Sequence, residues 1–371
     1  MTLIKRKFKR ILVKVGTSVI TSKKSRLDKT KIRKLVGEIA EIIDAGVEVI
    51  IVTSGAIGAG IGILKKSARP QSLPELQACA AIGQNQLMKQ YEEFFKKRGY
   101  ITAQILLTQE DLTDRKRYLN AKNTLLTLLE EKAVPVINEN DTVSTDEIKF
   151  GDNDRLSSLV ASLLKVDLLV MLTDVDGLCQ YDQKGKKVKC VNLVEKVTRD
   201  VENFALKQKS KSGIGGMVSK LQAAKIATSS GIPCIIANGT KRETLLKIIE
   251  GERVGTLFLA HRNAISAKKH WIAYTSKVQG TIKVDNGAKE ALVNKQKSLL
   301  PSGIIEGEGR FDVGDVVSII GEENEEFAKG FTNYSSLELR KIMGLKTGQI
   351  QSALGYKHYD EVVHRDNLVI L

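Results

Sequence analysis

Short apolar runs alternate with segments of helical apolar spacing over about the first 262 residues of the chain. The expected strands cover residues 10–15, 47–53, 100–107, 133–138, 167–173 and 232–237. This alternation predicts an α/β fold, with a mostly parallel sheet that helices cover on both faces. Ligands of such sheets bind beyond the carboxyl ends of the strands. The polar residues that follow each strand are therefore candidate site residues.

The character of the sequence changes near His261. From Gly280 onward, short apolar runs alternate with turns rich in Gly, Asp and Asn. This pattern predicts a small β-rich domain, which we expect to be a partly closed barrel. We expect a first domain over residues 1–262, a linker over 263–279, a second domain over 280–354 and a C-terminal tail over 355–371.

Composition limits the classes of protein to which the chain can belong. No run of about 18 apolar residues exists, so no transmembrane helix is expected. The basic N-terminus is followed by an apolar stretch that Lys14 interrupts, which argues against a secretory signal and predicts a cytoplasmic protein. The 4 cysteines are scattered without metal-ligand or CxxC spacing. Neither a zinc site nor a disulfide framework is expected.

The chain is strongly basic, with a net charge of +15. Such a charge suits nucleic acid, an anionic membrane surface or phosphorylated substrates. It also arises in a lysine-rich proteome, which is the interpretation we favour. Aromatic residues make up only 5% of the chain and do not interleave with the basic residues. No stacking platform for nucleic acid is therefore indicated.

The richest cluster of polar residues lies near the middle of the chain. Residues 134–141 read Val-Pro-Val-Ile-Asn-Glu-Asn-Asp, and residues 151–154 read Gly-Asp-Asn-Asp before a strongly helical segment. Amides and carboxylates at the end of a buried strand suit a polar, amine-bearing or metal-bound substrate. The alternative is that these residues only form turns and helix caps.

Two further strand ends suit an anion. Lys14 and Gly16 end the first strand, where a close backbone, hydroxyl groups and a lysine charge fit a phosphoryl group. Ser54 and Gly55 follow the next strand, where the amino end of a helix favours a carboxylate or a phosphate. Tight turns that need small side chains would explain both segments equally well.

Two later segments suit a nucleotide. Residues 172–178, which include Thr173 and Asp174, end another strand and could hold a nucleotide or a metal, although an ordinary Asp-Gly turn would look the same. Residues 213–220 form a glycine-rich loop that opens a helix, but its spacing matches neither the P-loop nor the dinucleotide pattern. Lys220 lies one turn inside this helix and could reach a phosphate at its start. Together, the anion sites and the Asn/Asp cluster fit phosphoryl transfer.

These motifs resemble the amino acid kinase family, in the form that carries a C-terminal PUA domain. The resemblance extends over nearly the whole chain, including Leu-Leu-Pro-Ser-Gly-Ile at 299–304. It implies an α/β/α sandwich and phosphorylation of the side-chain carboxylate of L-glutamate by ATP, with Mg²⁺. It further implies a place in proline biosynthesis, inhibition by proline and a homo-oligomer, either a dimer or a tetramer.

The resemblance also implies roles for individual residues. Lys14 and Lys220 would contact the transferring phosphoryl group, and Asp154 would orient them. Glutamate would be held by Ser54, Gly55, Asn138, Asp141 and Asn153. ATP would be bound by Lys14, Gly16, Thr173, Asp174, Ile214, Gly215, Gly216, Met217, Val218, Ser219 and Lys220. No protein metal ligand is expected.

The chain departs from the family at Ile214 and Val218, where hydroxyl residues are common. This departure concerns the affinity for the nucleotide rather than the reaction.

Two alternatives stay open. The acceptor could be aspartate, N-acetylglutamate or a nucleoside monophosphate, and the PUA domain could bind RNA as a secondary role. Acidic residues at 322–326 argue against the second alternative.

Overall fold

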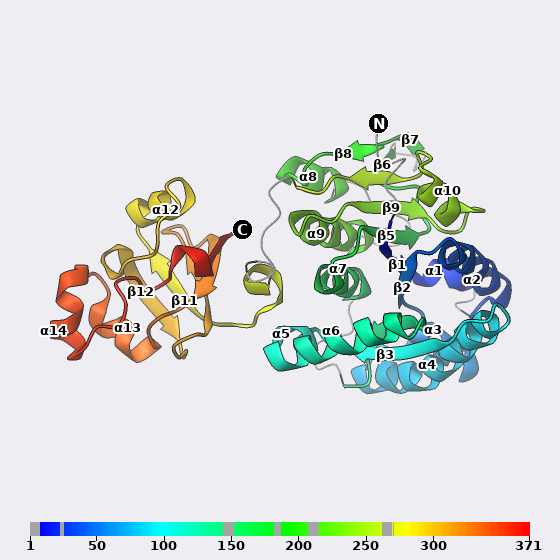
Figure 1. The fold of residues 1–371 in the computed structure, drawn as a ribbon, viewed down its shortest axis with the longest axis horizontal. Coiled ribbons are helices and arrows are strands. Elements are labelled where there is room, and N and C mark those ends of the chain that lie inside the picture. Colours follow the sequence, from blue (N-terminus) through cyan, green and yellow to red (C-terminus); the bar gives the residue numbers. More distant parts are fainter. Residues whose placement is uncertain are drawn as a thin grey trace. The chain divides into compact units, whose positions relative to one another are not determined.

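The structure is a computed structural model that describes residues 8–22, 26–143, 152–181, 187–206, 215–261, 269 and 271–371. The chain divides into two compact units, residues 1–264 and 265–371, which are both visible in Figure 1. Across the described part of the chain, no helix has the length and apolar character needed to span a membrane.

The first unit is built on an eight-stranded sheet in the order β3-β4-β2-β1-β5-β9-β10-β8. Strand β10 runs antiparallel to β9, whereas the other neighbouring strands run parallel. The prediction of a mostly parallel sheet is therefore confirmed. The strands are β1 (Arg10–Val15), β2 (Glu48–Thr53), β3 (Thr102–Leu107), β4 (Val134–Glu139), β5 (Leu168–Thr173), β8 (Leu193–Val194), β9 (Cys234–Asn238) and β10 (Thr256–Phe258).

Helices cover both faces of this sheet (Figure 1). One face carries α6 (Arg115–Glu130), α7 (Asp152–Leu164), α8 (Arg199–Leu206) and α9 (Gly215–Ser229). The other face carries α1 (Thr17–Ile20), α2 (Lys29–Asp44), α4 (Leu73–Lys96) and α10 (Thr244–Glu250). The remaining helices of this unit are α3 (Ala56–Ile63) and α5 (Gln109–Thr113). The strands are buried because both of their faces are covered.

Helices α3 and α4 approach each other unusually closely through two glycines. A Cβ atom on Gly60 would lie 1.9 Å from the Cys79 carbonyl oxygen, and one on Gly83 would lie 1.8 Å from the Ala56 carbonyl oxygen. Neither position has room for a side chain, so the two helix backbones touch directly. This contact fixes how far the next residue, Gln84, reaches towards the sheet.

A short hairpin, β6 (Cys179–Tyr181) and β7 (Lys187–Cys190), stands apart from the main sheet. Cys179 faces Cys190 across the two strands, and the pair forms a disulfide. The expectation that the cysteines form no disulfide was therefore wrong. The register of the hairpin brings the two cysteines together, and no spacing motif in the sequence records that register. Cys79 and Cys234 are buried free thiols.

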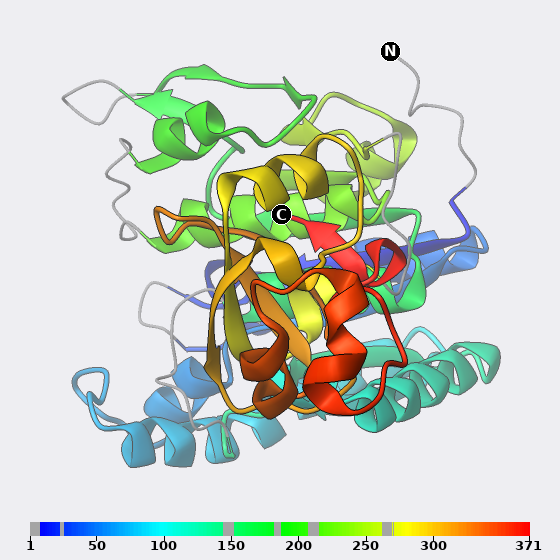
Figure 2. The ribbon, with the colours of Figure 1, turned by 90° about the vertical axis from the view of Figure 1, so that its left-hand side faces the viewer.

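The second unit contains a five-stranded sheet in the order β12-β11-β13-β14-β15. Figure 2 shows this sheet in yellow and orange, with the last strand in red. Its strands are β11 (Val278–Val284), β12 (Ile304–Gly309), β13 (Val316–Ile320), β14 (Glu326–Phe331) and β15 (Leu368–Ile370). Strand β15 lies within residues 355–371, which were expected to form a tail, and it pairs with β14.

Short helices complete the second unit. They are η1 (Trp271–Thr275), α12 (Asn286–Val293), η2 (Pro301–Gly303), α13 (Ser336–Ile342), η3 (Thr347–Gln349), α14 (Ile350–Leu354) and η4 (Arg365–Asn367). The unit has a hydrophobic core of its own, which includes Ile282, Val317 and Leu339. The sequence prediction of a separate β-rich domain at this end of the chain is therefore confirmed.

Candidate active site

Five neighbouring parallel strands end at one edge of the sheet, in the order β4, β2, β1, β5, β9. Their spacing of about 4.8 Å makes this edge roughly 19 Å long. Candidate residues stand at or just after each strand end: Asn138 on β4, Ser54 after β2, Gly16 after β1, Asp174 after β5 and Asn238 on β9. The edge therefore brings together segments that lie far apart in the sequence.

Two lysines meet one buried carboxylate at the centre of this edge. Lys14 Nζ lies 2.8 Å from Asp154 Oδ1, and Lys220 Nζ lies 3.2 Å from Asp154 Oδ2. The Ser219 hydroxyl donates to the same Oδ2 at 2.7 Å, and Lys220 also donates to the carbonyl of Gly216 at 3.0 Å. The Asp154 side chain is 1% exposed, so this cluster is almost entirely shielded from water.

Burial and charge act in opposite directions on this cluster. Burial lowers the pKa of Lys14, and the nearby charge of Lys220 lowers it further, whereas Asp154 raises it. Burial alone would raise the pKa of Asp154. The charges of Lys14 and Lys220, with hydrogen bonds from Lys14 and Ser219, outweigh burial and lower that pKa to about 2. Asp154 is therefore ionised at neutral pH and holds two cations together.

The strand and helix that carry this cluster explain its position. Alternate residues of a strand point to opposite faces. Val13 and Val15 enter the core beneath α2, and Lys14 between them points towards α7 and α9. Gly16 then lies against β5, where its N–H donates to the Leu172 carbonyl at 2.9 Å. A Cβ atom at position 16 would stand 2.9 Å from that same oxygen, which favours glycine there.

The β4 end of the edge is rich in amides. Asn153 Nδ2 donates to Asn138 Oδ1 at 3.1 Å, and Asn138 Nδ2 donates to Gln84 Oε1 at 2.8 Å. Asn153 and Asp154 are consecutive residues of α7 with different partners. Asn153 contacts the β4 end and Asp154 contacts the lysines, so the first turn of α7 joins the two parts of the site.

The β2 end lies between the amides and the lysines. Thr53 is buried, and its hydroxyl hydrogen-bonds with the Tyr91 hydroxyl at 3.0 Å. Ser54 is partly exposed. Gly55 precedes α3 with a φ of 106°, a conformation that favours glycine. Asp141 lies in the turn after β4 and is half-buried.

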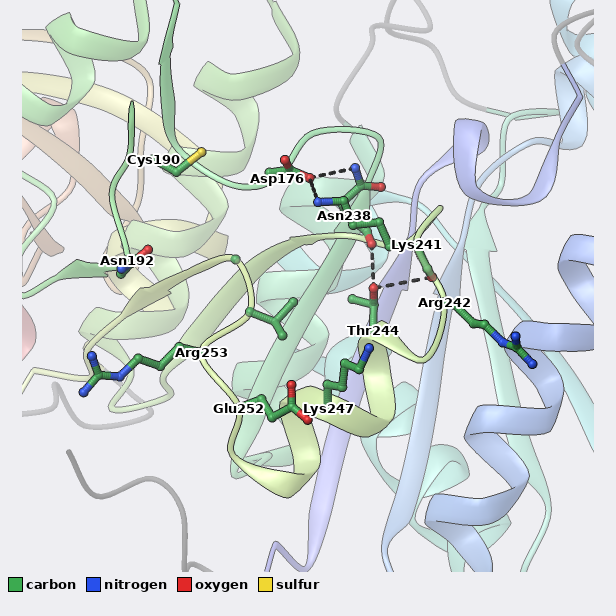
Figure 3. Close-up of a pocket in the computed structure, with 12 residues that line it drawn as sticks. Asp176, Cys190, Asn192, Asn238, Lys241, Arg242, Thr244, Lys247, Glu252 and Arg253 are labelled. Atoms are coloured by element: carbon green, nitrogen blue, oxygen red, sulfur yellow. Dashed lines mark hydrogen bonds and ion pairs between the residues drawn. The ribbon is translucent and has the colours of Figure 1, made fainter. Parts of the chain in front are cut away.

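The β5 and β9 end opens into a pocket of about 390 Å³ (Figure 3). Asn238 donates to the Asp174 carbonyl at 3.2 Å and to Asp176 Oδ1 at 3.0 Å. Lys241 forms an ion pair with Asp176 at 2.7 Å. Cys190 also borders the pocket, so the disulfide-linked hairpin forms part of its wall. Charged side chains of both signs line the pocket.

The structure thus brings most of the expected site residues to one edge. The segment from Gly215 to Lys220 forms the first turns of α9, beside Asp154. Ile214 and Gly151 lie outside the described residues. Gln84 was not expected in the site, and neither were the pocket residues Asn238 and Lys241. Asp176 lies within the candidate segment 172–178. One signal for Gln84 was available, since it interrupts the apolar face formed by Ala80, Leu87 and Tyr91 on α4.

Within the described residues, no group of three His, Cys, Asp or Glu side chains could hold a metal ion. Asp154 is already engaged by two lysines and a hydroxyl. A protein cage for Mg²⁺ is thus not apparent in this part of the chain. Mg²⁺ ordinarily keeps several waters and binds through substrate phosphates with few protein carboxylates, which agrees with this donor set.

Comparison with known proteins gives matches over both units. The amino acid kinase family matches residues 9–238, and the PUA domain matches residues 280–354. A glutamate 5-kinase of Caldanaerobacter subterraneus subsp. tengcongensis is 53% identical, covering 98% of each chain. Those of Thermoanaerobacter pseudethanolicus and Moorella thermoacetica are 50% and 45% identical, covering 98% of this chain and 98% and 96% of their own. The chain therefore belongs to the amino acid kinase family, a family of phosphotransferases, and carries a C-terminal PUA domain.

Proposed function

We propose that this protein transfers the γ-phosphoryl group of ATP to the side-chain carboxylate of L-glutamate, giving ADP and L-glutamyl 5-phosphate. One observation carries the proposal: Lys14 and Lys220 meet at Asp154, between an amide-rich strand end and a pocket lined by charged side chains. An acceptor at one end and a nucleotide at the other would place the travelling group beside both lysines. The names of the relatives support glutamate as the acceptor.

The proposed reaction needs no general base. A glutamate side chain has a pKa near 4.3, so its carboxylate is already a nucleophile at neutral pH. One carboxylate oxygen forms a bond to the γ-phosphorus while the bond to the β,γ-bridging oxygen breaks, and ADP leaves with that electron pair. Asp154, with a pKa of about 2, is a weak base and acts instead by positioning the two lysines.

The lysines stabilise charge on the moving group. The phosphoryl oxygens carry the negative charge during transfer, and preorganised cations in a water-poor site lower the barrier. Lys14 approaches from β1 and Lys220 from α9, so the two amines act from different elements. Binding of the anion would draw both amines partly away from Asp154, while Asp154 keeps them close enough to act together.

Glutamate would lie at the β4 and β2 end. Asn138, Asp141 and Asn153 offer carbonyl and carboxylate oxygens for the α-ammonium group and amide N–H groups for the α-carboxylate. Ser54 and Gly55 follow β2, which pairs with the strand that carries Lys14, and would hold an acidic group at the start of α3. This division leaves the side-chain carboxylate of glutamate pointing towards Lys14.

The nucleotide would lie at the other end. Thr173, Asp174 and the pocket beside Asn238 would take the nucleoside, and the first turn of α9 from Gly215 to Lys220 would meet the phosphates. Backbone N–H groups there offset the absence of hydroxyls at Ile214 and Val218. Mg²⁺ would arrive with the phosphates and neutralise part of their charge. On the resemblance, we further propose that the reaction belongs to proline biosynthesis and that proline inhibits it at the glutamate end.

The test is turnover that depends on the acceptor. We expect ADP release to require L-glutamate, and hydroxylamine to trap an acyl hydroxamate, since an acyl phosphate reacts with it. A parallel panel of L-aspartate, N-acetyl-L-glutamate and UMP should support much slower turnover. ADP release that does not depend on L-glutamate, or faster turnover with another acceptor, would contradict the proposal.

A further inference from the structure

Three side-chain amides form a connected row at the β4 end of the site. Asn153 Nδ2 donates to Asn138 Oδ1, and Asn138 Nδ2 donates to Gln84 Oε1. At the other end of the row, Asn153 Oδ1 accepts the backbone N–H of Glu139 at 3.2 Å. The row crosses the edge of the sheet, because Asn153 lies on α7 and Gln84 lies on α4, which cover opposite faces (Figure 1).

The direction of the row is set at its backbone end. The Glu139 N–H is a donor in every state, so Asn153 must turn its oxygen towards it and its nitrogen towards Asn138. Asn138 must then present its oxygen to Asn153 and its nitrogen to Gln84. Gln84 is the last acceptor, and its oxygen keeps the Asn138 amide from rotating. The backbone end therefore sets which side of Asn138 meets a substrate, and the hydrogen bond to Gln84 holds the amide in that orientation.

Gln84 lies deep in the first unit. It is 9% exposed, and its Nε2 atom is buried with no hydrogen-bond partner in the described structure. Burying an unpaired donor is unfavourable, and an apolar side chain of the same length would avoid it. The contribution that glutamine makes here, and that an apolar side chain cannot make, is its acceptor oxygen. The neighbouring residue, Gly83, lets α4 pack directly against the backbone of α3, where there is no room for a Cβ atom. This packing positions Gln84.

We infer that Gln84 is a positioning residue that locks the amide of Asn138 and thereby sets the affinity and selectivity of the site for its amino acid. The inference rests on the proposed function, because it assigns the amide row to the acceptor. A locked Asn138 presents a fixed pattern of donor and acceptor to the ammonium and carboxylate of an amino acid. A rotating amide would present either pattern and would discriminate less.

The first test is Gln84→Met, which removes the oxygen and keeps the length of the side chain. We expect the KM for L-glutamate to rise about 10-fold, as for the loss of one oriented hydrogen bond, with kcat and the KM for ATP within about 2-fold. The preference for L-glutamate over L-aspartate should fall. Gln84→Glu keeps an oxygen at this place. Its KM for L-glutamate should therefore be closer to that of the protein without substitutions than the KM of Gln84→Met.

A double substitution separates positioning from a general loss of structure. If Gln84 acts through Asn138, Gln84→Met should change the KM for L-glutamate little when Asn138→Ala is already present. The matched control is Gln90→Met, at another buried glutamine of α4 that is 2% exposed. It should affect stability, measured by thermal unfolding, and leave the KM for L-glutamate within about 2-fold.

Equal effects of Gln84→Met on both KM values, or additive effects with Asn138→Ala, would overturn the inference. An unchanged KM for L-glutamate in a folded Gln84→Met protein would also overturn it. These outcomes differ from a failure of the proposed function. In that case the protein without substitutions would show no turnover that depends on L-glutamate.

Discussion

At the scale of single residues, the site depends on one carboxylate, that of Asp154, which binds the amines of Lys14 and Lys220. Lys14 and Asp154 are both nearly excluded from water, and each alone would be unfavourable in that place. Together with Lys220 they form a cluster in which Asp154 offsets part of the positive charge. The remaining positive charge is what a transferring phosphoryl group would meet. The residues that fold the site are thus the same ones that would act on the substrate.

Lys220→Ala removes one of the two cations from this cluster. We expect kcat to fall by about 10²-fold or more, because a preorganised charge at the transition state is lost. Lys225→Ala is the matched control on the same helix, since Lys225 pairs only loosely with Glu202 at 3.8 Å and is 46% exposed. It should change kcat less than about 2-fold. A fall below about 3-fold for Lys220→Ala would refute the role given to this lysine.

Asp154→Asn leaves two lysines without their counter-charge. We expect the free energy of unfolding at pH 7 to fall by about 3 kcal/mol, as measured by urea denaturation. The pKa of Asp154 is about 2 in the folded protein and 3.8 ordinarily, so its stabilisation is complete above about pH 4 and is lost as pH falls through 2. The difference between the two proteins should therefore shrink below pH 4.

The control for this experiment is Asp114→Asn, which changes an aspartate that caps α6. Asparagine caps helices as well as aspartate does, so the free energy of unfolding should change by less than about 0.5 kcal/mol. A difference for Asp154→Asn that stays constant from pH 7 to pH 3 would show that its charge is not what stabilises the fold.

At the scale of elements, the site depends on two helices that reach the same strand end from opposite faces. Helix α7 brings Asn153 and Asp154 in consecutive positions, and α4 brings Gln84 and Tyr91 two turns apart. The position of α4 depends in turn on its backbone contact with α3 at Gly60 and Gly83. A change in that contact would move Gln84 and its hydrogen bond to Asn138, where we propose that glutamate binds.

Gly83→Ala tests this dependence directly. The added Cβ atom would lie 1.8 Å from the Ala56 carbonyl oxygen, so α3 and α4 must separate. We expect the free energy of unfolding to fall by about 1–3 kcal/mol and the KM for L-glutamate to rise. The matched change is Gly37→Ala within α2, where the nearest atom is a flexible arginine nitrogen at 3.5 Å.

Gly37→Ala should be neutral or stabilising by up to about 1 kcal/mol, because alanine favours a helix interior. Chemical denaturation of both variants measures the difference. Similar stability of the Gly83 and Gly37 variants would show that α3 and α4 yield easily, and that their close contact does not position Gln84.

At the scale of the whole molecule, the site residues belong to one unit. The first unit spans residues 1–264 and has a core cluster that joins its strands to α2 and α4. The second unit has a separate core. The proposed chemistry therefore draws on residues of the first unit.

A chain ending at residue 264 should fold and keep kcat within about 3-fold. The physical reason is that its core and the described site residues are retained. Circular dichroism and the coupled ADP assay measure fold and turnover on the same sample. A folded chain of this length without activity would show that the second unit takes part in catalysis.

The sequence alone determined the elements and most of the candidate residues. Strand burial and helix spacing follow local periodicity, so β1, β2, β4 and β5 were predicted within a few residues. Lys14, Ser54 and Thr173 stood out because each follows or ends an apolar run. The resemblance to a family then assigned roles to them.

Only the tertiary structure decided which of these residues meet. The order β4, β2, β1, β5, β9 differs from the order along the chain, and it places Lys14 and Lys220 on one carboxylate. Gln84 and the Cys179–Cys190 pair depend on how a helix packs and how a hairpin pairs. Local periodicity records which face of an element is buried, but not which distant element covers it.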